Sequence, residues 1–437
     1  MVSCVHGIAG LTRFATEIDR LNAAASRHNP FLSSAFLETY CRQCEYYVPD
    51  EGERLYLVWD GPALIGCVPM RRVADGGRFG AARALGWRSA RLCFMAPLDT
   101  ELPGALSAAV DEERVTNALI RHLRAEPGWD VLELVGLRRD GNLLRAMHAA
   151  GGWKFRVRDI AVEPYHDIEL VWDDLHAYFR SLAKKMRSNI SRQARRLFAA
   201  GEVVLVLADG AEATTAWFAA YCDLDGRSWK DGTAASMQRD SRRVQFYRDI
   251  AAGKGGLDPS FVGIILDDVL IAGLMLGSNA SASPLRHGAW CLEMAYDKSW
   301  AGLGSAQLLL LLAVKCSIER GHSHLSFMQN FSHFKHRWGA RPIEVVNVAL
   351  IRRATLRNLL LRLRDAAGVA RRARPQKSPP DRGLRTREAA GSSNTRSAPR
   401  TRQRAHELTA QALAATQHSI RRLDAAAASA CLPFALA

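Results

Sequence analysis

The fold of this chain is best read from one stretch, Glu293–Gly339, which runs EMAYDKSWAGLGSAQLLLLLAVKCSIERGHSHLSFMQNFSHFKHRWG. Its pattern predicts a strand, a glycine loop, a long apolar helix, a second strand and a basic, aromatic segment. Glycines let a loop turn its backbone N–H groups toward an anion, and the N-terminus of the following helix adds partial positive charge. The loop is therefore the predicted binding site for a diphosphate, and its residues are Gly302, Leu303, Gly304, Ser305 and Ala306.

A diphosphate site before an apolar helix makes an acyl-CoA donor the first hypothesis, and acyl transfer requires further groups. The acceptor attacks the thioester carbonyl, so the site needs donors for the oxyanion and a group that takes the acceptor's proton. Glu293 and Asp297 flank the end of the strand that leads into the loop, which makes them the candidate catalytic carboxylates. The alternative is that Asp297 caps the turn and that Glu293 is a solvated strand residue.

A second candidate group consists of Arg227, Trp229 and Lys230, which follow a predicted helix. An indole face and two cations suit a sugar or an anionic acceptor, since stacking and charge-assisted hydrogen bonds orient such ligands. The alternative is a tryptophan that anchors the helix to the core, with charges at its edge. Four histidines lie close together near the second strand, but their spacing does not predict a metal site: His322, His324, His333 and His336.

The net charge of +15 is concentrated near the C-terminus. Residues 361–404 contain 13 Lys/Arg and 3 Asp/Glu, a balance of +10, and residues 405–437 are neutral, which leaves +5 on residues 1–360. We therefore expect a mildly basic folded part and a disordered basic linker that has too few large apolar residues to bury. Nine scattered cysteines without a framework, and no apolar run long enough to span a bilayer, predict a soluble cytoplasmic protein.

The chain is also predicted to contain two related halves. Trp59–Gly66 (WDGPALIG) aligns with Leu266–Gly273 (LDDVLIAG), and both read as a hairpin with a tight acidic turn. Two further alignments follow in the same order, Met95-Ala96 with Met294-Ala295 and Val131–Leu134 with His324–Phe327. Because only the second half has a glycine cluster after its methionine, we expect the donor there. The expected organisation is an N-terminal lobe over 1–165, a catalytic lobe over 166–360, the basic linker over 361–404, and an alanine-rich helix and tail over 405–437.

Three segments together resemble one protein family. They are the basic helix LAKKMRSNISRQARRL at Leu182–Leu197, the GRSWKDG motif followed by a helix ending in VQFYRDI, and the AYDKSW, glycine-loop and FKHRWG elements of the opening stretch. Over roughly residues 180–340 the chain resembles the acetyltransferase domain of the GNAT superfamily called BioF2-like or CelD-like. Its duplication is similar to that of FemAB-type transferases.

The resemblance implies an α/β (α+β) fold of tandem GNAT-like domains with mixed, largely antiparallel sheets. It also implies an N- or O-acyltransferase of the acetyltransferase type that uses acetyl-CoA or another acyl-CoA as donor and no metal. The implied acceptor is a sugar or another intermediate of exopolysaccharide or cell-envelope biosynthesis. Lys335 matches a lysine of the family and is expected to contact phosphate.

Two other functions remain as hypotheses. One is a FemAB-like aminoacyl transferase that uses charged tRNA, which the charge of only +5 on residues 1–360 weakly opposes. The other is a non-catalytic GNAT-fold interaction module whose basic tail contacts nucleic acid or an anionic membrane. The basic helix itself is expected to dock on the core and to leave its charges solvated, because it carries an apolar stripe at helical spacing: Leu182, Met186, Ile190, Ala194 and Leu197.

Overall fold

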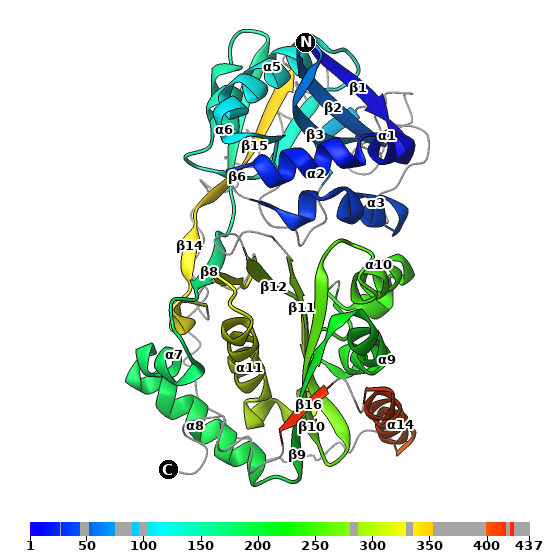
Figure 1. The fold of residues 1–437 in the computed structure, drawn as a ribbon, viewed down its shortest axis with the longest axis vertical. Coiled ribbons are helices and arrows are strands. Elements are labelled where there is room, and N and C mark those ends of the chain that lie inside the picture. Colours follow the sequence, from blue (N-terminus) through cyan, green and yellow to red (C-terminus); the bar gives the residue numbers. More distant parts are fainter. Residues whose placement is uncertain are drawn as a thin grey trace, which may run out of the picture.

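The computed structural model describes residues 1–26, 28–43, 52–74, 90–95, 104–233, 235–279, 287–328, 335–352, 399–416 and 420–423. These residues form two lobes stacked along the long axis of the molecule, each built on one eight-stranded sheet (Figure 1). Both sheets are mixed and mostly antiparallel, which confirms the predicted α+β class. None of the helices in the described ranges is both long and apolar enough to cross a bilayer.

The first sheet has the strand order β1-β2-β3-β4-β6-β15-β7, with β5 paired to β3. Neighbouring strands are antiparallel except β4 and β6, which helix α5 joins by a crossover. The strands are β1 (Val2–His6), β2 (Glu53–Asp60), β3 (Ala63–Ala74), β4 (Ala90–Phe94), β5 (Leu106–Ser107), β6 (Val131–Arg138), β7 (Phe155–Ala161) and β15 (Val345–Arg352). The helices are α1 (Gly7–Arg13), α2 (Ala15–Ala24), η1 (Pro30–Leu32), α3 (Ser34–Gln43), η2 (Ala109–Asp111), α5 (Glu112–Ala125) and α6 (Asn142–Ala149).

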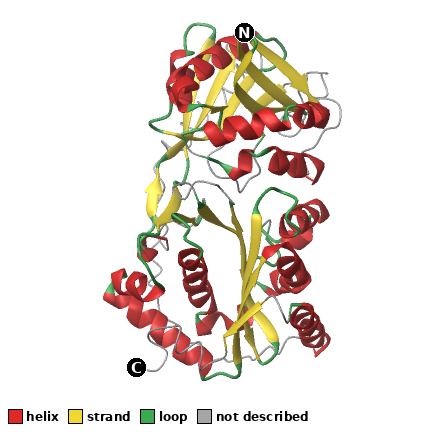
Figure 2. Ribbon diagram, in the orientation of Figure 1, coloured by secondary structure: helices red, strands yellow, loops and turns green. Residues whose placement is uncertain are grey.

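The second sheet has the order β14-β8-β13-β12-β11-β10-β9-β16, and its parallel pair is β12 and β13. Helices α8 and α11 lie on one face of this sheet and α9 and α10 on the other (Figure 2). The strands are β8 (Tyr165–Glu169), β9 (Val203–Asp209), β10 (Asp258–Leu266), β11 (Val269–Ser278), β12 (Gly288–Tyr296), β13 (His324–Ser326), β14 (Arg341–Ile343) and β16 (Ile420–Leu423). The helices are α7 (Leu175–Ser181), α8 (Lys184–Phe198), α9 (Gly210–Arg227), η3 (Met237–Arg239), α10 (Ser241–Ala251), η5 (Lys298–Leu303), α11 (Ser305–Glu319), η6 (His336–Trp338) and α14 (Pro399–Ala415).

The two lobes share one topology, in the order that the aligned segments predict. The β2–β3 hairpin corresponds to the β10–β11 hairpin, and both turn at the aligned WDGPALIG and LDDVLIAG segments. In each lobe the next strand is followed by a crossover helix and a parallel strand, β4-α5-β6 in the first and β12-α11-β13 in the second. The helices α5 and α11 are therefore topological equivalents.

The C-terminal elements β15 and α14 pack on different lobes. Strand β15 leaves the second lobe and inserts between β6 and β7 of the first sheet, so the range 166–360 contributes one strand to the N-terminal lobe (Figure 1). Helix α14 packs on α9, and its Thr409 Oγ1 accepts a hydrogen bond from the Leu270 N–H at 3.2 Å. This helix begins at Pro399, inside the range expected to be disordered, whereas residues 361–398 lie outside the described part of the chain.

Three large apolar clusters hold this arrangement together. One lies between the second sheet and helices α8 and α11, and it includes the whole predicted stripe of the basic helix, Leu182, Met186, Ile190, Ala194 and Leu197. Another fills the first lobe. The third joins the lobes, since Phe36 packs edge-on to Phe246 with ring centroids 5.7 Å apart and Phe31 packs on Trp290 at 5.6 Å. Each large apolar side chain buried there stabilises the fold by roughly 1.5–3 kcal/mol.

Candidate active site in the second lobe

The second sheet opens between its two parallel strands. β12 and β13 pair only over Gly288–Trp290 and His324–Ser326. β12 then continues to Tyr296 with β11 on one side, and within the described residues nothing pairs with its other edge. Because main-chain N–H and C=O groups require partners, this edge of β12 is suited to a ligand that lies between the strands.

A register shift lies in the same part of β12. Met275 pairs with Glu293 and Leu276 pairs with Cys291, so Leu292 has no residue opposite it on β11. A β-bulge of this kind turns backbone groups out of the ladder, and such bulges are common beside active sites. The bulge is next to Glu293, one of the two predicted catalytic residues.

The predicted anion loop forms the junction between η5 and α11. Gly304 adopts the left-handed conformation with a φ of 72° and directly precedes the first helical residue, Ser305. The Ser305 hydroxyl is buried and has no hydrogen-bond partner among the described residues. Gly302 is exposed, and a Cβ at that position would meet no atom within 4 Å. Since the first N–H groups of a helix have no intrahelical acceptor, the junction offers N–H donors and an unpaired hydroxyl to an anion.

Helix α8 covers part of this junction. A Cβ built on Gly304 would lie 2.6 Å from the Cβ of Gln193, and Asn189 Nδ2 donates a hydrogen bond to Gln307 Oε1 at 3.2 Å. The amide oxygen of Gln193 is buried and lacks a hydrogen-bond partner in the described chain. Gln193 therefore occupies the space beside Gly304, and we expect this side chain to move when a ligand contacts Gly304.

Glu293 is only 6% exposed and belongs to a buried network on the opposite face of the sheet. Its carboxylate accepts hydrogen bonds from Lys230 Nζ and, at 2.5 Å, from Arg243 Nη2. Lys230 Nζ also lies 3.7 Å from Asp225 Oδ1, and Asp225 in turn accepts from the Ser236 hydroxyl at 2.8 Å. Glu293 is thus not a solvated strand residue, and it shares its charge with two cations.

Asp297 has a structural role in addition to its predicted one. Its carboxylate caps η5 by accepting from the Ser299 N–H at 2.8 Å, and it forms an ion pair with Arg227 Nη1. Arg227 Nε also donates to Asp223 Oδ2 at 3.0 Å. The two predicted catalytic carboxylates are therefore paired with two of the predicted substrate-binding cations, Arg227 and Lys230. Each carboxylate would have to give up an ion pair to accept a proton.

The other predicted substrate-binding residues lie apart from this network. Trp229 is 38% exposed at the surface after α9. Lys335 is buried, and its Nζ donates to the Met328 carbonyl oxygen at 2.6 Å, just beyond the end of β13. Burial lowers the pKa of Lys335 from 10.5 to about 8, although the neighbouring Cys291 and Asp167 raise it in part. Lys335 is therefore a cation that can lose its proton near neutral pH.

Three residues around the site were not singled out by the sequence. Arg243 holds Glu293, and Gln193 covers the glycine junction. Tyr221 lies in the same network with its hydroxyl buried and without a hydrogen-bond partner among the described residues. Its pKa is raised well above the ordinary value of 10, first by burial and then by the carboxylates Glu293 and Asp225. Helical periodicity predicts that Gln193 is near the core, but nothing in the local sequence indicates which partner each of these residues meets.

Among the described residues, no group of three His, Cys, Asp or Glu side chains is placed to hold a metal ion.

Comparisons with known proteins agree with this geometry. Residues 184–336 match the acetyltransferase (GNAT) domain family. The crystal structure of FemX superposes with a TM-score of 0.53 at 11% identity and covers 83% of this chain and 99% of its own. A conserved protein of unknown function from Bacteroides thetaiotaomicron VPI-5482 gives a TM-score of 0.48 at 10% identity, with 80% of this chain and 100% of that chain covered. A tandem GNAT protein from the clavulanic acid biosynthesis pathway gives 0.48 at 12% identity, with 81% and 99% covered.

No curated protein sequence matches the chain. At 11% identity the likeness to FemX shows the fold alone, whereas the family match covers the segment from α8 to η6 that contains the splayed strands and the glycine junction. The predicted resemblance is confirmed: residues 184–336 match the acetyltransferase (GNAT) domain family, and the fold of the chain is similar to that of FemX.

Proposed function

We propose that this protein is an acyl-CoA-dependent N- or O-acyltransferase that binds its donor in the second lobe and acylates a sugar or another cell-envelope intermediate. One observation carries the proposal. Strand β12, which has one unpaired edge and a bulge in its pairing with β11, leads through η5 to the left-handed Gly304 at the N-terminus of α11, inside the segment that matches the acetyltransferase domain. Such a combination provides main-chain donors for both a thioester oxygen and a diphosphate.

The residues of the junction fit the donor in chemical type. Gly304 provides a backbone that approaches a ligand closely, and Ser305 provides a buried hydroxyl without a partner. The N–H groups of Ser305 and Ala306 start α11 and point toward its N-terminal side. These groups would hold the diphosphate once Gln193 has moved, and the N–H groups beside Leu292 would stabilise the negative charge that develops on the thioester oxygen.

Lys335 is a candidate to accept the proton. In the transfer, the acceptor N or O atom forms a bond to the thioester carbon, the C–S bond breaks, and the acceptor's proton must reach a base while the sulfur leaves. A lysine with a pKa of about 8 is partly neutral at neutral pH and can take that proton. Glu293 and Asp297 remain candidates, but each is already held by a cation, so we assign them first to orienting β12 and η5.

Calorimetry of acetyl-CoA and longer acyl-CoAs with the full chain tests the proposal. We expect micromolar binding that is lost in Gly304→Val, because a branched side chain at a φ of 72° is strained and collides with Gln193. Gly321→Val is the matched control, because Gly321 also has a left-handed φ of 67° but follows the opposite end of α11, where a Cβ meets no atom within 4 Å, and it should bind as the unmodified chain does. Failure of every acyl-CoA to bind the unmodified chain would exclude the proposal.

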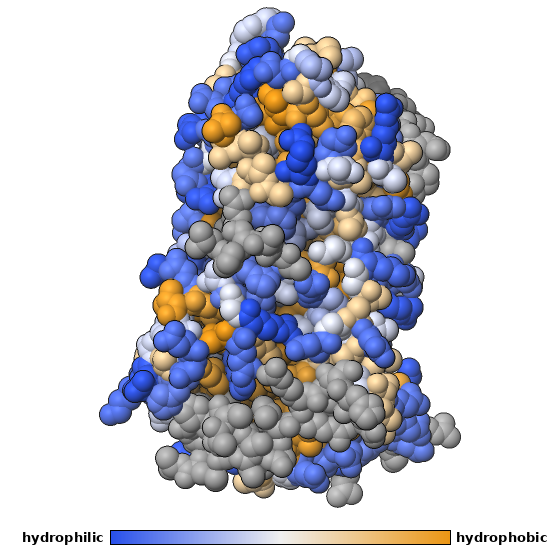
Figure 3. Space-filling view, in the orientation of Figure 1, coloured by the Kyte–Doolittle hydropathy of each residue, from blue (hydrophilic) through white to orange (hydrophobic). Residues whose placement is uncertain are grey.

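A second candidate function is aminoacyl transfer from charged tRNA, and the surface of α8 favours it. The helix has no acidic residue, and its exposed cations form no ion pair with a described residue; they are Lys184, Lys185, Arg192, Arg195 and Arg196. Figure 3 shows hydrophilic side chains along the edge where Figure 1 places α7 and α8. If this function is correct, tRNA should bind the full chain with an affinity that falls steeply with salt and that decreases when Arg192, Arg195 and Arg196 are replaced by Gln. Acyl-CoA binding without tRNA binding would reject it.

A further inference from the structure

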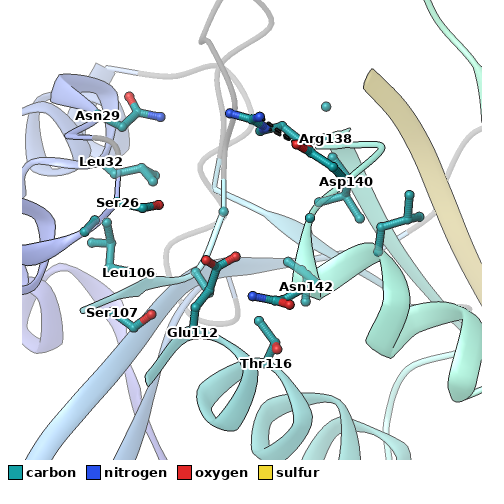
Figure 4. Close-up of a pocket in the computed structure, with 18 residues that line it drawn as sticks. Ser26, Asn29, Leu32, Leu106, Ser107, Glu112, Thr116, Arg138, Asp140 and Asn142 are labelled. Atoms are coloured by element: carbon teal, nitrogen blue, oxygen red, sulfur yellow. Dashed lines mark hydrogen bonds and ion pairs between the residues drawn. The ribbon is translucent and has the colours of Figure 1, made fainter. Parts of the chain in front are cut away.

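The first lobe contains a cavity of about 430 Å³. This volume falls within the range of roughly 300–1,000 Å³ that is typical of small-molecule sites. The cavity lies where β5, the end of β6 and the starts of α5 and α6 meet (Figure 4). Its polar lining includes Ser26, Asn29, Ser107, Glu112, Thr116 and Asn142.

The position of this cavity in the fold corresponds to the glycine junction of the second lobe. Helix α5 connects β4 to its parallel partner β6, as α11 connects β12 to β13. In the second lobe α8 covers the N-terminus of the crossover helix through Gln193, whereas in the first lobe the N-terminus of α5 opens into the cavity. The duplicated fold thus has a second ligand-sized space at an equivalent place.

The charge of the cavity lining disfavours an anionic ligand of the kind expected in the second lobe, because its charged residues are the two carboxylates Glu112 and Asp140 and the single cation Arg138. Glu112 and Glu113 form the first turn of α5, where carboxylates interact favourably with the helix dipole and repel a phosphate. Arg138 donates to both carboxylate oxygens of Asp140, at 3.0 and 2.8 Å, so its charge is already neutralised. The Glu112 carboxylate points into the cavity (Figure 4). It forms no salt bridge with a described residue, and its interaction with Arg138 is a longer-range one that is weaker than the Arg138–Asp140 pair. The cavity therefore attracts a cation.

The floor of the cavity offers hydroxyl groups. Ser107 is only 3% exposed, and its Oγ has no hydrogen-bond partner among the described residues. Thr116 Oγ1 donates to the Glu113 carbonyl at 3.0 Å and keeps its own lone pairs for an incoming donor. Buried hydroxyls are normally paired, so Ser107 is a specific place for a ligand hydroxyl. Leu32 and Leu106 add an apolar wall that suits the C–H face of a ring.

We propose that this cavity is a binding site for a small polyhydroxylated ligand that carries one ammonium group and no phosphate, which by chemical class is an amino sugar. Glu112 would pair with the ammonium group, and Ser107 and Thr116 would bind ring hydroxyls. The inference concerns the first lobe and stands independently of the acyl transfer proposed for the second. If the transfer proposal is also correct, the ligand is a candidate for the acceptor or for part of it.

Calorimetry of the full chain with glucosamine, glucose and glucosamine 6-phosphate tests the ligand class. We expect glucosamine to bind about 10-fold or more tightly than glucose, because only glucosamine forms a charge-assisted bond to Glu112. Glucosamine 6-phosphate should bind no more tightly than glucosamine. Absence of glucosamine binding, or tighter binding of the phosphorylated sugar, would overturn the proposal.

Two variants and a matched control locate the site. Glu112→Gln should weaken glucosamine binding about 10-fold or more and abolish the preference over glucose, and Ser107→Ala should weaken both sugars by several-fold. Glu113→Gln is the control, because Glu113 lies in the same helical turn but does not line the cavity. An equal loss in the control would contradict the assignment. Acetyl-CoA binding is measured on the same samples: if it persists while glucosamine binding is absent from the start, this inference fails and the proposed transfer does not.

Discussion

Helices α5 and α11 occupy the same topological place in the two lobes, but their N-termini meet opposite environments. The first turn of α5 carries Glu112 and Glu113 and opens into a cavity. The start of α11 carries Gly304 and Ser305 without a carboxylate and is covered by α8. The two proposals together imply that one duplicated scaffold presents a helix end as an anion site or as a cation site, depending on two or three side chains in its first turn.

A second contrast concerns charge. In the second lobe Glu293, Lys230 and Arg243 form ion pairs whose side chains are 5%, 7% and 25% exposed. In the first lobe the parallel strands β4 and β6 are themselves joined by an ion pair, in which Glu133 binds Arg91 at 2.6 Å with side chains 23% and 38% exposed. We therefore expect this network of the second lobe to contribute far more to stability than the Arg91–Glu133 pair of the first.

The largest expected effect tests this contrast in charge. Glu293→Ala leaves Lys230 and Arg243 without their counter-ion, and we expect it to lower the free energy of unfolding by about 3–5 kcal/mol. Glu133→Ala, which breaks the more exposed Arg91–Glu133 pair of the first lobe, should change the same quantity by about 1 kcal/mol or less. Urea denaturation of the two variants measures both, and equal losses would show that the two lobes do not differ in this respect.

The next effect concerns the buried Lys335. Its pKa is about 8 in the folded chain and 10.5 when unperturbed, so between these values the unfolded state binds more protons and the free energy of unfolding rises with pH. Relative to Lys335→Met, the unmodified chain should gain up to about 3 kcal/mol between pH 8 and 10.5. Denaturation across this range measures the difference between the two proteins. A difference that falls with pH would contradict the lowered pKa.

If Lys335 also accepts the proton, the pH dependence of the transfer rate should follow the same group. The rate would rise about 10-fold per pH unit below pH 8 and level off above it, because only the neutral amine accepts a proton. Lys335→Met should remove this rise. Initial rates of acylation between pH 6 and 9 measure the pH dependence of both proteins. A rise that survives the substitution would assign the base to another group.

A smaller effect is expected at the glycine junction. Gly304→Ala places a Cβ at a φ of 72° and against Gln193, and we expect it to lower the free energy of unfolding by about 1–3 kcal/mol. Gly302→Ala, four ångströms or more from any neighbour, should be close to neutral. Thermal unfolding distinguishes the two substitutions. If neither substitution changes the unfolding temperature, the left-handed conformation of Gly304 is not required for the packing of Gln193 against the N-terminus of α11.

The smallest effect tests the cover over α11. Gln193→Ala removes the side chain that must move before a ligand contacts Gly304, so we expect acyl-CoA affinity to rise by about 2–10-fold. The same substitution should leave glucosamine binding in the first lobe unchanged. A loss of acyl-CoA affinity would mean that Gln193 holds the ligand rather than covers its site.

Much of this arrangement was predictable because it depends on local pattern. The apolar run of α11, the glycines before it and the stripe from Leu182 to Leu197 each follow from periodicity or backbone freedom. The duplication was also visible, since both hairpins keep their acidic turn and their aliphatic pair. These features depend on residues within one or two turns of each other.

The partners of the candidate site residues were not predictable. Glu293 meets Arg243, which lies 50 residues away, and Asp297 meets Arg227 at a separation of 70. β15 crosses to the first sheet although it follows the second lobe in sequence. The cavity around Glu112 and Ser107 is assembled from five short segments, none of which carries a motif.

The sequence by itself determined the class of fold, the two halves and the place of the glycine junction, because strand alternation, helical stripes and glycine turns are properties of neighbouring residues. Only the tertiary structure decided that the candidate carboxylates are ion-paired, that Gln193 covers the junction and that a cavity opens at Glu112. These outcomes depend on which side chains are brought within a few ångströms of each other by chain segments far apart in sequence. Burial in the folded structure then shifts the pKa of an ionisable side chain, as it lowers the pKa of Lys335 to about 8.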